Sequence, residues 1–215
     1  MTRYQRHHWY LAMALAALAG FVDAIGFLYT GGFFTAFMTG NSTRMAVGLF
    51  TDGRIAGIAA AMIATFVAGV VLGSLVGHMC PTRYRLPLTI TGVALLLAMA
   101  AGLAMAGMGT AAVGCTLLAM GMENTVFQRE GQVSIGLTYM TGTLVKLGQS
   151  LARIHHAGQR WTWVPHLLLW SGLVGGAGLG VVAYLDMALL ALWIASGAGL
   201  ALALLACLPR FALLD

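Results

Sequence analysis

The sequence predicts an all-α, polytopic membrane helix bundle that contains two internal repeats. Composition gives the first reason: 60% of the 215 residues are hydrophobic and only 8% are charged, whereas soluble domains carry about 25% charged residues. Long uncharged stretches give the second, because about 20 apolar residues cross a bilayer. No Asp, Glu, Lys or Arg occurs in residues 55–79, 86–122, 161–185 and 187–209.

A duplicated set of short motifs is the third reason. Gly20-Phe-Val-Asp23 recurs as Gly121-Met-Glu-Asn124, and Met38-Thr39-Gly40-Asn41 recurs as Met140-Thr141-Gly142-Thr143, at offsets of 101 and 102 residues. A glycine stripe recurs at an offset of 103, as Gly69, Gly73, Gly77 and then Gly172, Gly176, Gly180. Ordered matches with a slowly drifting offset indicate duplication. We therefore expect one membrane domain, 1–215, with repeat 1 over about 9–107 and repeat 2 over about 110–208.

Six strongly apolar segments are expected to cross the membrane, at about 9–29, 55–79, 86–107, 110–127, 163–185 and 187–208. The uncharged stretch 86–122 is too long for one crossing, so it should turn at Gly107-Met108-Gly109-Thr110. Two weaker segments, 33–50 and 133–152, are interrupted at their middle by Thr-Gly and a polar residue. They are either broken or re-entrant elements, which gives six crossings, or full spans, which gives eight.

Loop charge distinguishes these topologies. With a cytoplasmic N-terminus, eight crossings place six basic loop residues inside and three outside, whereas six crossings place eight inside and one outside. The positive-inside rule favours the second arrangement. We therefore expect six crossings plus two re-entrant elements, with both termini cytoplasmic, in the cell (inner) membrane. Three crossings per repeat would invert the halves relative to each other.

The same motifs carry a resemblance to a known family. Gly20 through Ala24, Phe34 through Asn41, Met120 through Asn124 and Thr138 through Leu144 resemble the YoaK family, also catalogued as domain of unknown function 1275. The resemblance extends over nearly the whole chain and implies a polytopic cell-membrane protein without an assigned activity. The family usually has Gln where Glu123 stands, and apolar residues where this chain has Ser42, Thr43 and Arg44.

Acidic residues in the apolar segments are candidate ligands. Asp23 lies about 21 Å along the first helix from Trp9 at 1.5 Å per residue. An ionisable group at such a depth costs several kcal/mol unless it is paired or hydrated. Asp23 is therefore either an ion, proton or substrate ligand, or a structural partner of Arg44 that stabilises a broken element. Glu123 and Asn124 occupy the matching place in the second repeat, where Glu123 alternatively forms an interfacial pair with Arg129.

The two Thr-Gly elements are the strongest candidates for a polar site. A glycine that turns the backbone out of a helix frees N–H and C=O groups, which in a membrane must face protein or water. Hydroxyl and amide side chains, and the partial charge of half-helix ends, add affinity for a small solute or ion. The alternative is a helix contact held by Thr and Asn. The site candidates are Asp23, Thr39, Gly40, Asn41, Arg44, Glu123, Asn124, Thr141, Gly142, Thr143 and Lys146.

The leading interpretation is an integral-membrane transporter or channel for a small solute or ion, with its polar site between the repeats. A non-transporting membrane subunit or scaffold is the alternative. A membrane enzyme is less expected, because the sequence has no nucleophile elbow, His-rich metal box or phosphate loop. The glycine stripes should pack against each other or against a second copy in a homo-oligomer. The expected partners are the lipid bilayer and an unknown solute, with no cofactor, metal or nucleic acid.

Overall fold

The computed structural model describes residues 6–129, 132–133, 135–154 and 161–208. This part of the chain is α-helical, as predicted, except for connecting segments and one small antiparallel hairpin. The hairpin pairs β1 (Gln128–Arg129) with β2 (Gln132–Val133). The long helices are α1 (Arg6–Thr30), α3 (Gly53–Met79), α4 (Thr82–Met105) and α7 (Val164–Met187). The short ones are α2 (Met38–Thr51), α5 (Gly109–Glu123), α6 (Met140–Leu151) and α8 (Leu192–Ala206), with the 3-10 turn η1 (Ala188–Ala191) before α8.

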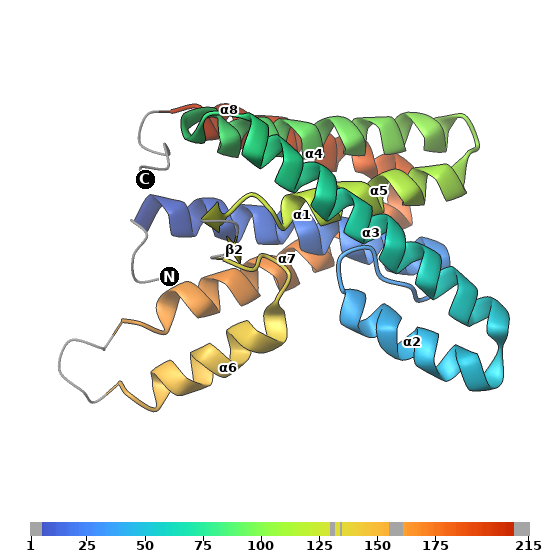
Figure 1. Ribbon diagram of the computed structural model, residues 1–215, viewed down its shortest axis with the longest axis horizontal. Helices are drawn as coiled ribbons and strands as arrows, with labels where there is room; N and C mark the ends of the chain where they lie inside the picture. The colour runs from blue at the N-terminus through green and yellow to red at the C-terminus, as the bar shows by residue number, and fades with distance from the viewer. Residues whose placement is uncertain (1–5, 130–131, 134, 155–160, 209–215) are drawn as a thin grey trace.

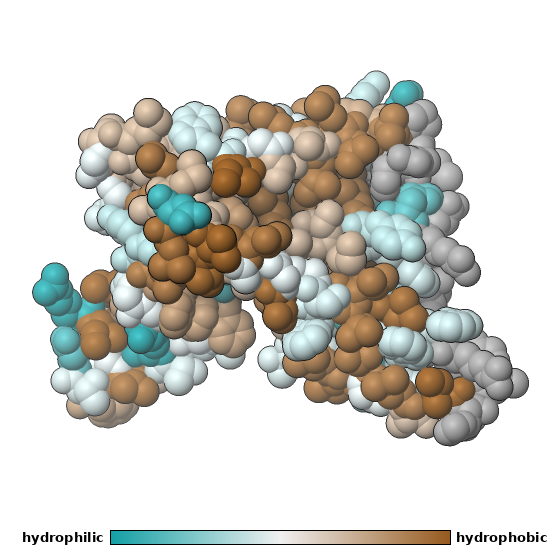
Figure 2. All heavy atoms as spheres, turned by 180° about the vertical axis from the view of Figure 1, so that it is seen from behind, coloured by the Kyte–Doolittle hydropathy of each residue, from teal (hydrophilic) through white to brown (hydrophobic). Residues whose placement is uncertain are grey.

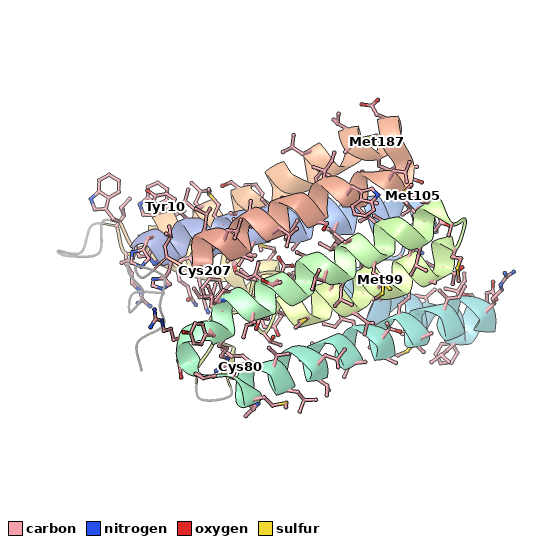
Figure 3. The ribbon with its side chains drawn as sticks, turned by 90° about the horizontal axis from the view of Figure 1, so that it is seen from above. Tyr10, Cys80, Met99, Met105, Met187 and Cys207 are labelled. Atoms are coloured by element: carbon pink, nitrogen blue, oxygen red, sulfur yellow. The ribbon has the colours of Figure 1, made fainter. Side chains whose placement is uncertain are left out.

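The long helices lie roughly along the longest axis of the molecule (Figure 1). Tyr10, Cys80 and Cys207 lie at one end of this axis, and Met105 and Met187 lie at the other (Figure 3). We call these the Tyr10 end and the Met105 end. The start of α1, the connection from α3 to α4 and the end of α8 therefore share the Tyr10 end. The expected turn between α4 and α5 lies at the Met105 end, and Gly107 adopts a φ of 76° there.

Four helical stretches are long and apolar enough to cross a membrane: His7–Thr30, Gly53–Met79, Thr82–Met105 and Val164–Ala206. The last contains α7, η1 and α8, and the chain turns back after Met187, where Ala188 has a φ of 50°. The expected strong span over 110–127 is not a helix of that length, because α5 has 15 residues and ends at Glu123. The total of six crossings stays a prediction.

The two weaker apolar segments form the short helices α2 and α6. Both helices begin near the middle of the long axis and run to opposite ends of the molecule (Figure 1). The expected interruption at Thr-Gly is wrong in position, because α2 begins at Met38 and α6 at Met140, so each Thr-Gly lies in a first helical turn. The non-helical backbone comes earlier. In the first repeat it contains Gly31 and Gly32, with φ values of 70° and 112°.

The glycine stripes bring helices into backbone contact within the chain. On α7, a side chain at Gly176 would collide with the backbone of Ala17, and one at Gly180 with that of Phe21, so α7 lies directly on α1. A glycine surface permits this approach because it has no Cβ atoms to separate the backbones.

The stripe on α3 makes the same kind of contact with α5. Side chains at Gly69 and Gly73 would collide with Leu118 and with Met122 and Thr125. The expectation that the two stripes pack against each other is therefore wrong. These glycines are buried inside one chain, so they are not available to a second copy.

Candidate polar site at the starts of α2 and α6

Asp23 holds the segment that leads into α2. Its Oδ1 accepts hydrogen bonds from the backbone N–H groups of Thr35 and Ala36, each at 2.7 Å. The Thr35 hydroxyl donates to the Val22 carbonyl at 3.3 Å. Backbone N–H groups just before a helix have no partner in that helix, so an acceptor on a neighbouring helix satisfies them. Asp23 therefore stabilises the broken element, as one of the two sequence interpretations expected.

Arg44 is not the partner of Asp23, which corrects the other part of that interpretation. The guanidinium of Arg44 lies 4.6 Å from the centre of the Phe33 ring, in a cation–π arrangement. The hydrogen bonds of Asp23 go instead to the returning backbone. The half-buried Arg44 thus keeps its positive charge within α2 without a carboxylate beside it.

Asn41 closes the loop before α2. Its side-chain amide donates to the Phe34 carbonyl at 2.7 Å and accepts from the Phe34 N–H at 3.0 Å. The rings of Phe34 and Phe37 lie where a side chain on Gly40 would be. Asn41 and Gly40 therefore serve the fold directly, and Thr39 is the exposed member of this element.

A related hydrogen bond ties the segment that leads into α6. Oδ1 of Asn124, the residue after α5, accepts a hydrogen bond from the Thr138 hydroxyl at 3.0 Å. The Asn124 amide also donates to the Met120 carbonyl at 3.0 Å. Thr138 precedes α6 as Thr35 precedes α2, at the offset of 103 residues. Sequence reasoning did not select either threonine as a site residue. The offset of 102 residues at Met38 and Met140 pairs Thr35 with Leu137, so the two threonines match only after a shift of one residue.

The remaining candidates in the second repeat differ in exposure. Thr141, Gly142 and Lys146 are exposed. Thr143 is buried, and its hydroxyl donates to the Tyr139 carbonyl at 3.1 Å, one turn earlier in the chain. The space-filling view has a hollow in the molecular outline between α2 and α6 (Figure 2). An exposed threonine of a Thr-Gly element thus lies on each of the two helices that flank the hollow.

Glu123 is the last residue of α5 and is fully buried. In the part of the chain that the structure describes, neither of its carboxyl oxygens has a hydrogen-bond partner. The interfacial position expected for it stays a prediction. The side chain of its expected partner, Arg129, lies outside the described residues.

A polar network at the Tyr10 end was not expected from the sequence. Arg85 on α4 donates to Oε1 of Gln128 at 2.8 Å, and the Gln128 amide donates to the Ser74 hydroxyl at 3.1 Å. Gly77 leaves the space that the Arg85 guanidinium occupies. The third glycine of the α3 stripe therefore makes room for a side chain instead of a helix backbone.

No group of three or more His, Cys, Asp or Glu that could hold a metal ion occurs among the described residues. Cys80, Cys115 and Cys207 are free thiols. The candidate site is therefore built from hydroxyl groups, amides and backbone at the starts of two short helices, with Arg44 and Lys146 one to two turns further along.

Long apolar helices with polar residues at their breaks define a polytopic helical membrane protein. The chain belongs to the family described as protein of unknown function (DUF1275), whose model matches residues 11–205; the resemblance seen in its motifs is thereby confirmed. It is 33% identical over 192 residues to the UPF0700 transmembrane protein RA0705 of Rhizobium meliloti (strain 1021), covering 89% of this chain and 83% of that relative. No solved structure matches the chain.

Proposed function

We propose that this protein is a small transporter or channel of the cell (inner) membrane, with a polar site for a small solute or ion at the two Thr-Gly elements between its repeats. The proposal assigns no catalytic activity. Thr39 and Thr141 are then the side chains that meet the solute, because each is exposed and lies on one of the two helices that flank the hollow (Figure 2).

One observation carries the proposal: α2 and α6 both begin near the middle of the molecule and diverge toward opposite ends (Figure 1). The first N–H groups of a helix lack intrahelical acceptors and carry partial positive charge. Non-helical backbone at membrane depth must be satisfied by protein or must line a water-filled cavity. Two such helix starts from matched repeats form the arrangement that membrane transporters use for polar solutes.

Contacts between the repeats support a shared axis. Leu118 and Met122, which contact the α3 stripe, follow Ala17 and Phe21, which contact the α7 stripe, by 101 residues. Each stripe thus lies on the first helix of the other proposed repeat.

A hydrogen bond near the proposed axis also supports it. The Ser196 hydroxyl on α8 donates to the Ala94 carbonyl on α4 at 2.9 Å, and the two residues are 102 apart. Contact between matched positions is expected where a pseudo-two-fold axis passes between two helices. A site on that axis would be lined by both Thr-Gly elements.

The ends of the helices support the proposed topology. Arg83 and Arg85 open α4 at the Tyr10 end, close to where α1 begins and α8 ends (Figure 3). Six crossings with two re-entrant elements place this end in the cytoplasm, as the positive-inside rule favours. The inverted halves then bring α2 from one membrane face and α6 from the other.

A second candidate function is a membrane subunit that transports nothing. It is favoured by the hydrogen bonds of Asp23 and Asn41, because both side chains are engaged by the backbone of the same chain. On this alternative the polar residues only stabilise the broken elements.

A thermal-stability screen of the purified protein separates the two functions. A solute that binds the folded state at 100 times its dissociation constant stabilises it by about 2.7 kcal/mol. We expect an ion or small metabolite to raise the melting temperature of the wild type, and a Thr39→Ala, Thr141→Ala double variant to lose that increase. Ser42→Ala, an exposed hydroxyl on the same helix, is the matched control. A folded protein that no solute stabilises would favour the subunit.

A further inference from the structure

Glu123 is a buried acid that the proposed site does not use. It ends α5, its side chain has 0% exposure, and neither carboxyl oxygen has a hydrogen-bond partner among the described residues. The polar residues that follow are engaged elsewhere. Asn124 meets Thr138, and the Thr125 hydroxyl donates to the Met122 carbonyl at 2.7 Å.

Among the described residues, no charged or titratable group on the helices packed against α5 hydrogen-bonds this acid. These helices are α1, α3 and α4. Their candidate groups toward the interior or the Tyr10 end are His8, Asp23, His78 and Arg85, and none of them hydrogen-bonds Glu123. Arg85 donates to Gln128, His78 is hydrogen-bonded to the Ser74 carbonyl, and Asp23 binds the backbone before α2.

The first repeat gives the apolar counterpart of this position. Glu123 matches Val22 at the offset of 101 residues, and Val22 is also fully buried. The matched position of the proposed first repeat is therefore filled by a hydrocarbon side chain and not by an acid. An ionised carboxylate without a partner in such surroundings is far more costly than a neutral acid.

We infer that Glu123 is a proton-binding site, which holds its proton at neutral pH and exchanges it with water when the α5 region opens. Release breaks the carboxyl O–H bond, transfers the proton to water and leaves a carboxylate; rebinding reverses this step. The ligand is thus a proton. A role of this exchange in coupling rests on the proposed transport function, but the proton site itself does not.

Infrared spectroscopy of the purified protein in lipid tests the site directly. We expect a carbonyl band of a protonated carboxyl at neutral pH, which decreases reversibly as the pH is raised. Glu123→Gln should lose this band. Asp186→Asn, which removes an exposed acid near the end of α7, should keep it.

Glu123→Val reproduces the residue of the first repeat and tests a purely structural role. We expect it to melt at the wild-type temperature or above. A marked decrease in its melting temperature would overturn the inference, as would a band that survives in Glu123→Gln or that does not respond to pH while the protein stays folded.

Proteoliposomes separate the proton site from the transport function. With candidate solutes from the stability screen, wild-type uptake should respond to an imposed pH gradient and Glu123→Gln uptake should not. An equal response in both would overturn the coupling role. If no solute is taken up while the band still titrates, the proton site stands and the transport function fails.

Discussion

Asp23 is an intramembrane acid whose partners are backbone groups. One oxygen accepts two N–H groups from the chain that returns toward the middle of the molecule. This arrangement explains why an acid stands beside a broken element: the N–H groups of residues 35 and 36 would otherwise be buried without acceptors. The hydrogen bonds of Asp23 are thus made by backbone N–H groups and not by Arg44.

Replacing Asp23 should therefore destabilise the fold. Asp23→Ala leaves two backbone donors without their acceptor, each at about 1–3 kcal/mol, so we expect a loss of about 2–5 kcal/mol in the free energy of unfolding. Thermal or denaturant melting of the purified protein measures it. Ser42→Ala, whose hydroxyl is exposed, should change stability little.

A double variant distinguishes this account from an ion pair. Adding Arg44→Gln to Asp23→Ala should not restore stability, because the two side chains do not contact each other. Recovery of the wild-type melting temperature in the double variant would show that the pair exists and that the backbone role of Asp23 is secondary.

At the scale of single residues, the candidate side chains could be selected from the sequence, but most of their contacts could not be predicted from it. Asp23, Asn41 and Asn124 were selected because polar groups are rare in apolar helices. Their partners depend on where the chain returns after Thr30 and Glu123, and no local pattern encodes that path. The burial of Glu123 was missed for the same reason, because its position relative to the membrane was inferred from an assumed helix end.

The Thr-Gly elements contain two glycines in matched positions with different surroundings. Gly40 lies against the rings of Phe34 and Phe37, whereas nothing lies within 4 Å of a side chain placed on Gly142. Gly40→Ala should destabilise by about 1–3 kcal/mol through overpacking. Gly142→Ala, its control, should be neutral or stabilising by up to about 1 kcal/mol, because Ala favours helix over Gly. Equal effects in melting experiments would contradict the contacts described for Gly40.

The helix contacts of the glycine stripes lead to a further prediction at the scale of elements. Gly176→Leu inserts a side chain into the backbone of α1 at Ala17, so we expect misfolding or a loss of more than about 3 kcal/mol. Gly175→Leu lies on an exposed face of the same helix with no neighbour within 4 Å and should keep the wild-type melting temperature. Size-exclusion profiles and melting curves of the two variants test the contrast.

The stripes also explain one limit of the sequence alignment. Gly69 contacts Leu118 and Gly176 contacts Ala17, so Gly69 corresponds to Gly176 in the helix packing. The sequence match instead pairs Gly69 with Gly172. A stripe with glycine at every fourth residue matches itself equally well after a shift of one helical turn. The existence of a close helix contact was therefore predictable, but its register and its partner helix were not.

At the scale of the whole molecule, the helix ends form two groups. The start of α1, the connection from α3 to α4 and the end of α8 lie at the Tyr10 end (Figure 3). The connection from α2 to α3 and the end of α7 lie at the opposite end (Figure 1). Six crossings with two re-entrant elements account for this grouping, and loop charge had favoured the same topology.

Cysteine accessibility tests this topology in intact cells. In a background without the three native cysteines, an impermeant reagent should label Gly53→Cys and Met187→Cys from outside. It should label Arg83→Cys and Arg153→Cys only after the membrane is opened. Labelling of Arg83→Cys and Met187→Cys from outside, without labelling of Gly53→Cys or Arg153→Cys, would restore eight crossings.

The membrane class, the helices and the turn at Gly107 were accessible from the sequence, because apolar length and glycine conformation are local properties. The exact start of each broken element could not be predicted. The Thr-Gly motif indicated a break in what is the first turn of α2, whereas the non-helical backbone contains Gly31 and Gly32. The shared site depends on long-range geometry, and it stays a prediction that the repeats suggest.

The distance between Thr39 and Thr141 tests the central claim most directly. Spin labels at Thr39→Cys and Thr141→Cys, in the cysteine-free background, report it by pulsed electron spin resonance in lipid. A Thr39→Cys, Thr51→Cys pair serves as a ruler, because both residues lie on α2 and twelve helical steps span about 18 Å. A single polar site predicts a separation below about 20 Å. A larger separation, more than half of the roughly 30 Å hydrocarbon thickness, would contradict a site shared by the two repeats.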